Sequence, residues 1–244
     1  MMPTDSSVYP VGPASAMPLR RLAVFFKNPV AGQVKTRLAR RLGDEQALAA
    51  YRAMAADLLS NLEPLREIVV PYFDSLPAEG SSLFSEKRRP EADAGCAGIR
   101  IQQGRDLGER MAGAFRELFA EGVDEVLLIG SDIPQIDSFL IAGYFQALQA
   151  HDVVIGPAAD GGYYLIGFSR ESFAEELFEG IDWSTERVYR QTLERARSAG
   201  LSVHSGPTLR DIDTYEDLES LIHERNAEVY LYDLVRLFLQ RKGA

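Results

Sequence analysis

Short apolar runs without charges alternate along the chain with longer stretches in which apolar residues recur at helical spacing. The clearest run, residues 126–129, leads directly into Gly130-Ser131-Asp132-Ile133-Pro134. An uncharged run of this length is typical of a strand buried on both faces, as in a parallel α/β sheet. The pattern predicts strands over residues 22–26, 67–73, 99–103, 124–129, 152–155, 163–168 and 201–204.

The intervening stretches predict helices. The longest covers residues 36–62, and Gly43 and Asp44 are expected to interrupt it. Other predicted helices cover residues 107–120, 138–150, 185–199, 214–223 and 227–240, the last one amphipathic. Strands that alternate with helices indicate a three-layer α/β/α fold with a mostly parallel sheet. Within the strand at 67–73, Pro71 favours a strand end or a sheet edge.

At 244 residues, the chain is expected to form one main domain over residues 21–225. Residues 1–20 are predicted to be a disordered leader, and residues 226–244 a C-terminal helix that packs on the domain or forms a homodimer contact. The leader lacks the basic and apolar regions of a signal peptide, and no apolar run reaches the roughly 18 residues of a membrane span. The single cysteine, Cys96, allows no internal disulfide and fits a cytoplasmic location.

The net charge of −10 argues against a general affinity for nucleic acid. Between Asp5 and Asp44, however, the chain has seven basic residues and no acidic one. A local basic segment in an acidic protein indicates a site for a small anion, although Arg40 and Arg41 also fit a solvated helix face.

Asp132 follows the central predicted strand, at the edge where open α/β sheets bind ligands. Gly130 permits a sharp turn there, and Pro134 stiffens the exit. The alternative is that Asp132 caps the next helix, but Asp137 and Ser138 already provide a cap.

The loop after the first predicted strand contains Pro29, Gly32, Lys35, Thr36 and Arg37 and leads into a helix. Amide groups at a helix start, together with basic side chains, suit a phosphate or pyrophosphate. A P-loop is disfavoured because the residue before the lysine is not glycine. A cation at this end opposes the helix dipole, so a compensating anionic group is expected; a basic helix start without a ligand is the alternative.

Carboxylates also occur near two later strand ends. Asp211 and Asp213 precede a helix and are expected to point towards Asp132, where they would hold Mg²⁺ or Mn²⁺. Glu216 and Asp217 are better explained as partners of the helix dipole. Asp160-Gly161-Gly162-Tyr163 allows close approach of a ligand, or forms a simple hairpin turn.

Two further segments are candidates for the same rim. Residues 103–110, which include Asp106 and Arg110, offer polar side chains at a helix start. Trp183 is either a stacking surface for a sugar or base, or a core anchor before a helix capped by Ser184. The three histidines show no ligand spacing.

These segments together resemble a bacterial family of GT-A-like transferases, labelled as selenodomain-associated or arsenosugar-biosynthesis-associated glycosyltransferases. The similarity spans roughly residues 21–221. Its marks are residues 29–38, 106–111, 130–134, 160–164 and 211–214. More distant relatives include the phospholactate and molybdenum-cofactor guanylyltransferases, so the resemblance implies a GT-A-like, Rossmann-like nucleotide-binding domain.

By this resemblance, Asp132 and Asp213 are the expected metal ligands for Mg²⁺ or Mn²⁺, and Asp132, Lys35 and Asp160 the expected catalytic residues. Nucleotide or phosphate contacts are expected from Pro29, Gly32, Lys35, Thr36, Arg37, Asp106, Arg110 and Ser131. Acceptor contacts are expected from Gly161, Gly162, Tyr163 and Trp183.

The implied activity is metal-dependent transfer of a sugar from a nucleotide sugar to a small acceptor. Gly130 stands where a full Asp-x-Asp glycosyltransferase motif has its first aspartate, which keeps nucleotidyl transfer to a small phosphorylated metabolite open. A nucleotide-binding protein without turnover is the third alternative.

Overall fold

Seven strands form one mixed sheet in the computed structural model, which describes residues 17–76 and 98–222. They are β1 Arg20–Phe26, β2 Val69–Phe73, β3 Arg100–Ile101, β4 Glu125–Gly130, β5 Val153–Pro157, β6 Tyr163–Ser169 and β7 Val203–Ser205. Their order is β3-β2-β1-β4-β6-β5-β7, and β6 pairs antiparallel with both β4 and β5. The turn from β5 to β6 therefore lies at the same sheet edge as the carboxyl end of β4.

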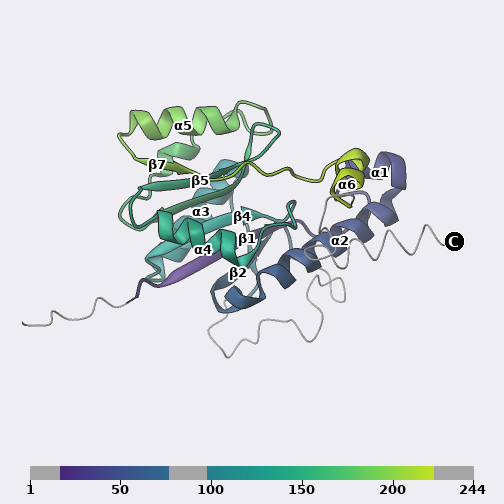
Figure 1. Cartoon of the computed structure of the whole chain (residues 1–244), viewed down its shortest axis with the longest axis horizontal. Coiled ribbons are helices and arrows are strands. Elements are labelled where there is room, and N and C mark those ends of the chain that lie inside the picture. Colours follow the sequence, from purple (N-terminus) through teal and green to yellow (C-terminus); the bar gives the residue numbers. More distant parts are fainter. Residues whose placement is uncertain (1–16, 77–97, 223–244) are drawn as a thin grey trace, which may run out of the picture.

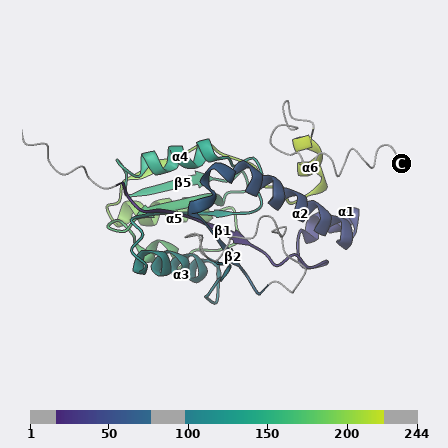
Figure 2. The ribbon, with the colours of Figure 1, turned by 90° about the horizontal axis from the view of Figure 1, so that it is seen from below.

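Helices cover both faces of this sheet. They are α1 Thr36–Leu42, α2 Asp44–Asn61, α3 Leu107–Ala120, α4 Ser138–Ala147, α5 Val188–Ser198 and α6 Tyr215–Ile222, with 3-10 turns η1 Glu63–Ile68 and η3 Glu175–Phe178. In Figure 2, α2 and α4 lie on one face of the sheet and α3 and α5 on the other. The three-layer fold with a mostly parallel sheet is thus confirmed.

Strand β1 shows why the central strands carry no alternating charges. Leu22, Val24 and Phe26 pack into the cluster under α2 and α4, whereas Ala23 and Phe25 pack into the cluster under α3. Successive side chains of a strand point to opposite faces, so a strand covered on both sides needs apolar residues throughout. The same holds for β4.

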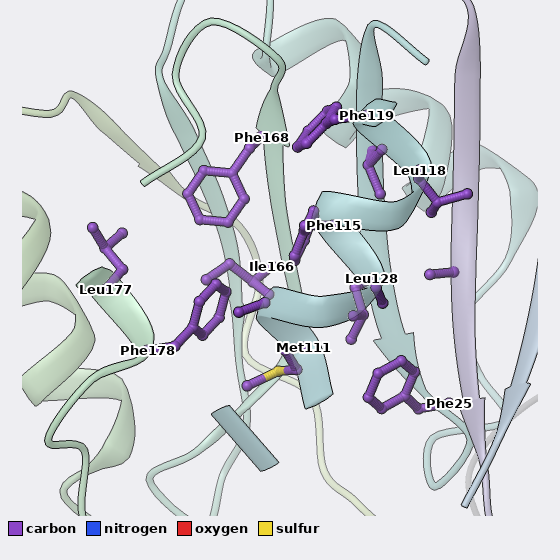
Figure 3. Packing of buried hydrophobic residues seen from close by; sticks show 14 of the residues in the cluster. Phe25, Met111, Phe115, Leu118, Phe119, Leu128, Ile166, Phe168, Leu177 and Phe178 are labelled. Carbon is purple, nitrogen blue, oxygen red and sulfur yellow. The ribbon is translucent and has the colours of Figure 1, made fainter. Parts of the chain in front are cut away.

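The layer under α3 is built around Phe115, whose side chain is fully buried (Figure 3). Its ring is stacked with those of Phe119, Phe173 and Phe178 at centroid distances of 6.1, 5.5 and 6.0 Å. The ring of Phe168 meets it edge-on at 5.0 Å. Stacked and edge-on aromatic pairs contribute beyond their buried area, which makes this cluster a centre of stability.

A third cluster lies beside the sheet, where α1 and α6 pack next to the first turns of α2 (Figure 1). Its buried members include Val34, Leu38, Tyr51, Met54 and Leu218. The later turns of α2 belong to the main core instead. One helix thus connects the sheet to the small unit formed with α1 and α6.

Most boundaries agree with the sequence predictions, including the break at Gly43, which adopts a φ of 83°. Pro71 lies inside β2 and not at its end; β3 pairs only with Tyr72 and Phe73, so Pro71 is outside that pairing. Helix α5 begins at Val188, three residues later than predicted, and its N-cap position is Arg187; Ser184, with a φ of 64°, lacks the extended backbone of a cap residue, so the predicted cap at Ser184 is wrong.

The predicted helix at 227–240 and residues 1–16 of the predicted leader lie outside the described residues. Strand β1 begins at Arg20. Among the described residues, no helix combines the length and apolar character needed to cross a membrane.

Candidate functional site

Asp132 lies just beyond the carboxyl end of β4, as predicted. The cap of α4 is Asp137, whose carboxylate accepts a hydrogen bond from the backbone of Leu140 at 2.8 Å. The capping alternative for Asp132 is therefore wrong. Instead, Oδ1 of Asp132 forms an ion pair with Nζ of Lys35 at 2.8 Å, while its side chain stays 39% exposed.

Lys35 lies at the centre of the site. Its Nζ donates to the backbone oxygen of Ile212 at 2.6 Å and also contacts Oδ1 of Asp213 at 3.1 Å. The Lys35 side chain is only 3% exposed. The anionic group expected near this helix start is thus supplied by Asp132 and Asp213, two carboxylates from distant parts of the chain.

Arg37 lies at the outer side of the same cluster. Its Nη1 is 3.4 Å from Oδ2 of Asp213, and its side chain is 68% exposed. A guanidinium so placed can reach an incoming anion while one side contacts a carboxylate. Arg37 is thus an exposed cation of the site, whereas Lys35 is buried.

Opposing effects determine the pKa values of Lys35 and Asp132. Burial alone lowers the pKa of Lys35, but the carboxylates of Asp132 and Asp213 outweigh it and raise the pKa above its ordinary value. For Asp132, burial raises the pKa, but the Lys35 ammonium dominates and holds it below the usual range. Both groups are therefore charged near neutral pH.

Asp211 behaves in the opposite way. Burial raises its pKa, and so do the negative charges of Asp160 and Asp213. Asp160 and Asp213 therefore both lie close enough to Asp211 to influence its charge. The prediction that Asp213 points towards Asp132 is supported through their shared contact with Lys35.

The lead-in to α6 is fixed to the sheet and to α1. The backbone nitrogen of Ile212 donates to the oxygen of Asp132 at 3.2 Å. Arg41 contacts Glu216 at 2.9 Å, and its guanidinium lies 4.0 Å from the ring centre of Tyr215. Glu216 therefore has two structural roles: it contacts Arg41 of α1, and its negative charge interacts favourably with the dipole of its own helix.

Tyr51 is a site residue that sequence reasoning missed. Its hydroxyl donates to the backbone oxygen of Lys27 at 3.0 Å and accepts from the backbone nitrogen of the same residue at 2.9 Å. It also lies 3.4 Å from Oγ of Ser131, which is buried. The hydroxyl ties the ends of β1 and β4 together. A tyrosine within an otherwise aliphatic helix stripe was the signal available in the sequence.

The turn between β5 and β6 is a hairpin, which was one of the two interpretations of residues 160–163. The nitrogen of Ala158 donates to the oxygen of Gly162 at 3.0 Å, and Oδ1 of Asp160 accepts from the nitrogen of Gly162 at 2.8 Å. Gly161 has a φ of +90°, and a side chain there would clash with the backbone of Glu186. This glycine is required by packing, and the acceptor roles of Gly161 and Gly162 stay predictions.

A second group of predicted residues lies at the start of α3. Asp106 caps this helix through a 2.9 Å bond from the nitrogen of Glu109, and Nε of Arg110 donates to the oxygen of Gly104 at 3.3 Å. Trp183 packs directly on Gly108 and meets the ring of Tyr163 edge-on at 6.4 Å. These contacts favour the anchor interpretation of Trp183, although the ring stays partly exposed.

The remaining predicted residues lie on the loop before α1. Pro29 is buried, whereas Gly32 and Thr36 are exposed. Lys35 has left-handed backbone angles, φ 49° and ψ 45°, and occupies the N-cap position of α1. The structure therefore brings together Lys35, Arg37, Asp132 and Asp213, with Ser131 behind them.

Two carboxylates around one cation are a partial ligand set. Within residues 17–76 and 98–222, no group of three or more histidine, cysteine or acidic side chains is placed to hold a metal. Mg²⁺ is commonly bound by one or two carboxylates plus substrate phosphates. The all-oxygen donors of Asp132 and Asp213 fit Mg²⁺ or Mn²⁺ in that manner.

The raised pKa of Asp211 leads to a stability prediction. The folded state holds this proton more tightly than the unfolded state, so stability falls as pH rises from the ordinary pKa of 3.8 through the folded value. At pH 7 Asp211 is charged and destabilises the folded state to its full extent. Asp211→Asn is therefore expected to raise Tm by about 1–3 °C. Thermal unfolding of both proteins in EDTA, at pH 7 and below pH 4, measures this; the difference should vanish at the lower pH.

Asp217→Asn is the control of opposite sign. Burial raises the pKa of Asp217, but hydrogen bonds from Thr214 dominate and lower it. Its stabilisation is present above the ordinary pKa and is lost as pH falls through the folded value. The Asn variant should therefore melt about 1–4 °C lower at pH 7. Equal effects of the two substitutions would contradict the electrostatic description.

Comparison with known proteins shows which family this chain is similar to. The model of DUF2064, described as an uncharacterized protein conserved in bacteria, matches residues 78–185. A crystal structure from Desulfovibrio desulfuricans G20, provisionally assigned as a nucleotide-diphospho-sugar transferase, is 35% identical, with a TM-score of 0.80 over 92% of this chain and 95% of that one.

The chain is also similar to two guanylyltransferases that act on 2-phospho-L-lactate according to their names. The one from Methanocaldococcus sp. FS406-22 is 26% identical over 78% of this chain and 77% of its own length. The one from Methanocaldococcus vulcanius is 25% identical over 78% of this chain and 80% of its own length. The fold is shared with Rv0371c of Mycobacterium tuberculosis at a TM-score of 0.51 and 14% identity.

The sheet order, the layers and these relatives define a transferase of the GT-A-like class. Within that class, the chain belongs to the DUF2064 family. The resemblance of five short sequence segments to a GT-A-like transferase family is confirmed at that level.

Proposed function

We propose that this protein transfers a group from a nucleotide-linked donor to a small acceptor, with a divalent cation held by Asp132 and Asp213. The observation that carries the proposal is the convergence of these two carboxylates on one cationic position beside the exposed guanidinium of Arg37. A bound Mg²⁺ or Mn²⁺ would neutralise charge that develops on the donor phosphates. The names of the similar proteins support a nucleotide-linked donor.

The residues of the chain divide the remaining work. Arg37 is exposed and binds donor phosphate, and the amides of the loop before α1 add hydrogen-bond donors. Asp160, exposed in the turn between β5 and β6, is the proposed base that accepts the acceptor's proton. Gly161 and Gly162 keep that turn free of side chains, so the acceptor approaches the backbone closely.

Sugar transfer is the first form of the proposal, supported by the provisional assignment of the 35% identical crystal structure. In sugar transfer, an acceptor hydroxyl attacks the anomeric carbon of the donor sugar and loses its proton to the base. The nucleoside diphosphate is the leaving group. Nucleotidyl transfer is the second form, favoured by Gly130 and by the guanylyltransferase relatives. There, a phosphate oxygen of the acceptor attacks the α-phosphorus and pyrophosphate leaves.

A melting experiment with nucleotide ligands tests the proposal and separates its two forms. UDP-, GDP- and CDP-sugars and the corresponding triphosphates are added with and without Mn²⁺. A ligand at 100 times its Kd should stabilise the protein by about 2.7 kcal/mol, or a Tm rise of about 5–10 °C. Stabilisation by nucleotide sugars supports sugar transfer, and stabilisation by triphosphates alone supports nucleotidyl transfer. The absence of any nucleotide-dependent shift would refute both forms.

A further inference from the structure

The ammonium of Lys35 has no hydrogen-bond donor left over. A lysine ammonium carries three donors. In Lys35 they meet three acceptors, the oxygen of Ile212 at 2.6 Å, Oδ1 of Asp132 at 2.8 Å and Oδ1 of Asp213 at 3.1 Å. While these contacts stand, Lys35 has no donor to offer to a phosphate.

The backbone of Lys35 holds the ammonium in that place. Its left-handed φ of 49° is unusual for a residue with a side chain, and such a conformation persists only where the surroundings determine it. The oxygen of Lys35 accepts the first helical bond of α1, from the nitrogen of Ala39 at 2.8 Å. The lysine is thus anchored through its backbone at α1 and through its side chain between β4 and the lead-in to α6.

A divalent cation held by Asp132 and Asp213 would bind the same two carboxylates that Lys35 contacts through one oxygen each, and Arg37 already lies against the second oxygen of Asp213. Two cations at one position repel each other strongly where the side chains are buried, and Lys35 is buried. Metal and ammonium therefore compete for Asp132 and Asp213. The competition is relieved when donor phosphates arrive, because they provide the ammonium with new acceptors and the metal with new ligands.

From this geometry we infer that Lys35 is a built-in counter-cation that keeps the carboxylate pair closed to metal until a nucleotide is bound. The inference rests on the proposed function, in which Asp132 and Asp213 hold the divalent cation. Lys35 acts here as a positioning residue: it fixes the spacing of two carboxylates and makes metal and nucleotide binding depend on each other.

The test measures Mn²⁺ binding to the nucleotide-free protein by electron paramagnetic resonance of the free ion. Lys35→Gln removes the competing charge and is expected to bind Mn²⁺ at least about tenfold more tightly than the unaltered protein, since close charge pairs couple by at least this factor. A gain in metal affinity is a result that loss of a merely structural lysine would not produce. Unchanged or weaker Mn²⁺ binding in Lys35→Gln would overturn the inference.

Lys27→Gln is the matched control. Lys27 is exposed, and its charge also lowers the pKa of Asp132, but without a contact to the carboxylate. Lys27→Gln removes one positive charge near Asp132, as Lys35→Gln does. A purely long-range effect would therefore raise the Mn²⁺ affinity equally in both variants. Only Lys35→Gln is expected to show the large gain, and an equal gain in the control would contradict competition at the contact.

The unaltered protein gives a second measurement that does not depend on how the variant folds. Its Mn²⁺ affinity without nucleotide should be weak, with a Kd of about 1 mM or above. A Kd of about 10 µM or below would overturn the inference even if Lys35→Gln does not fold, because such binding is tight for a two-carboxylate site blocked by a cation. Failure of the nucleotide-melting experiment, by contrast, would refute the proposed function and leave these Mn²⁺ measurements standing.

Discussion

Asp132→Asn is expected to abolish the Mn²⁺-dependent part of nucleotide stabilisation, reducing a Tm rise of about 5–10 °C to about 1 °C or less. Asparagine keeps an oxygen that can accept from Lys35 but loses the charge that a divalent cation requires. If turnover is detected with any donor, kcat/KM should fall on the order of 10²–10³-fold, as for the loss of one group that stabilises developing charge. Thermal melts with matched nucleotide and Mn²⁺ provide the measurement.

Asp137→Asn is the control for this substitution. It makes the same chemical change five residues along the chain, at a carboxylate that caps α4 and accepts from Leu140. Because asparagine is also a good cap, its effect on stability should be within about 1 kcal/mol and its Mn²⁺ dependence unchanged. A metal-dependent shift retained in Asp132→Asn would remove Asp132 from the metal site.

The largest effect on stability is expected from Phe115→Ala. Phe115 is fully buried and its ring contacts four other phenylalanine rings. Truncation removes the buried ring and leaves a cavity that close-packed neighbours fill only in part, at a cost of about 3–5 kcal/mol. Urea unfolding followed by circular dichroism measures this as a lower midpoint at an unchanged slope.

Phe139→Ala provides the comparison with an exposed ring. Phe139 lies on α4 and is 86% exposed, so its removal should change stability by no more than about 0.5 kcal/mol. A cost below about 1 kcal/mol for Phe115→Ala would show that the rings around it are not packed as described.

The sequence carried enough information to predict the sheet and its burial. Residues 22–26 of β1 and 126–129 of β4 are all apolar because both faces of these strands are covered, and that pattern is visible without any structure. The helix break at Gly43 and the cap at Asp137 follow from local chemistry in the same way. Asp132 was recognisable because a glycine and a proline enclose it at a strand end.

The centre of the site could not be predicted from local patterns. Lys35 meets Asp132 and Asp213 from positions roughly a hundred and nearly two hundred residues away, and only the folded sheet brings these segments together. Its left-handed backbone is likewise imposed by the surrounding packing, because lysine has no local preference for it. The sequence showed a basic loop and two acidic segments, but not that the lysine itself would neutralise them.

Helix α2 has a mechanical consequence for any movement of this site. Its early turns, with Tyr51 and Met54, belong to the cluster shared with α1 and α6, and its next turn, with Ala55 and Leu58, is embedded in the sheet core. A continuous helix is stiff along its axis, so the early turns of α2 keep a fixed position relative to the turns that are embedded in the sheet core. The loop between β1 and α1, which ends at Lys35, therefore connects two parts of the fold whose relative position is set by α2.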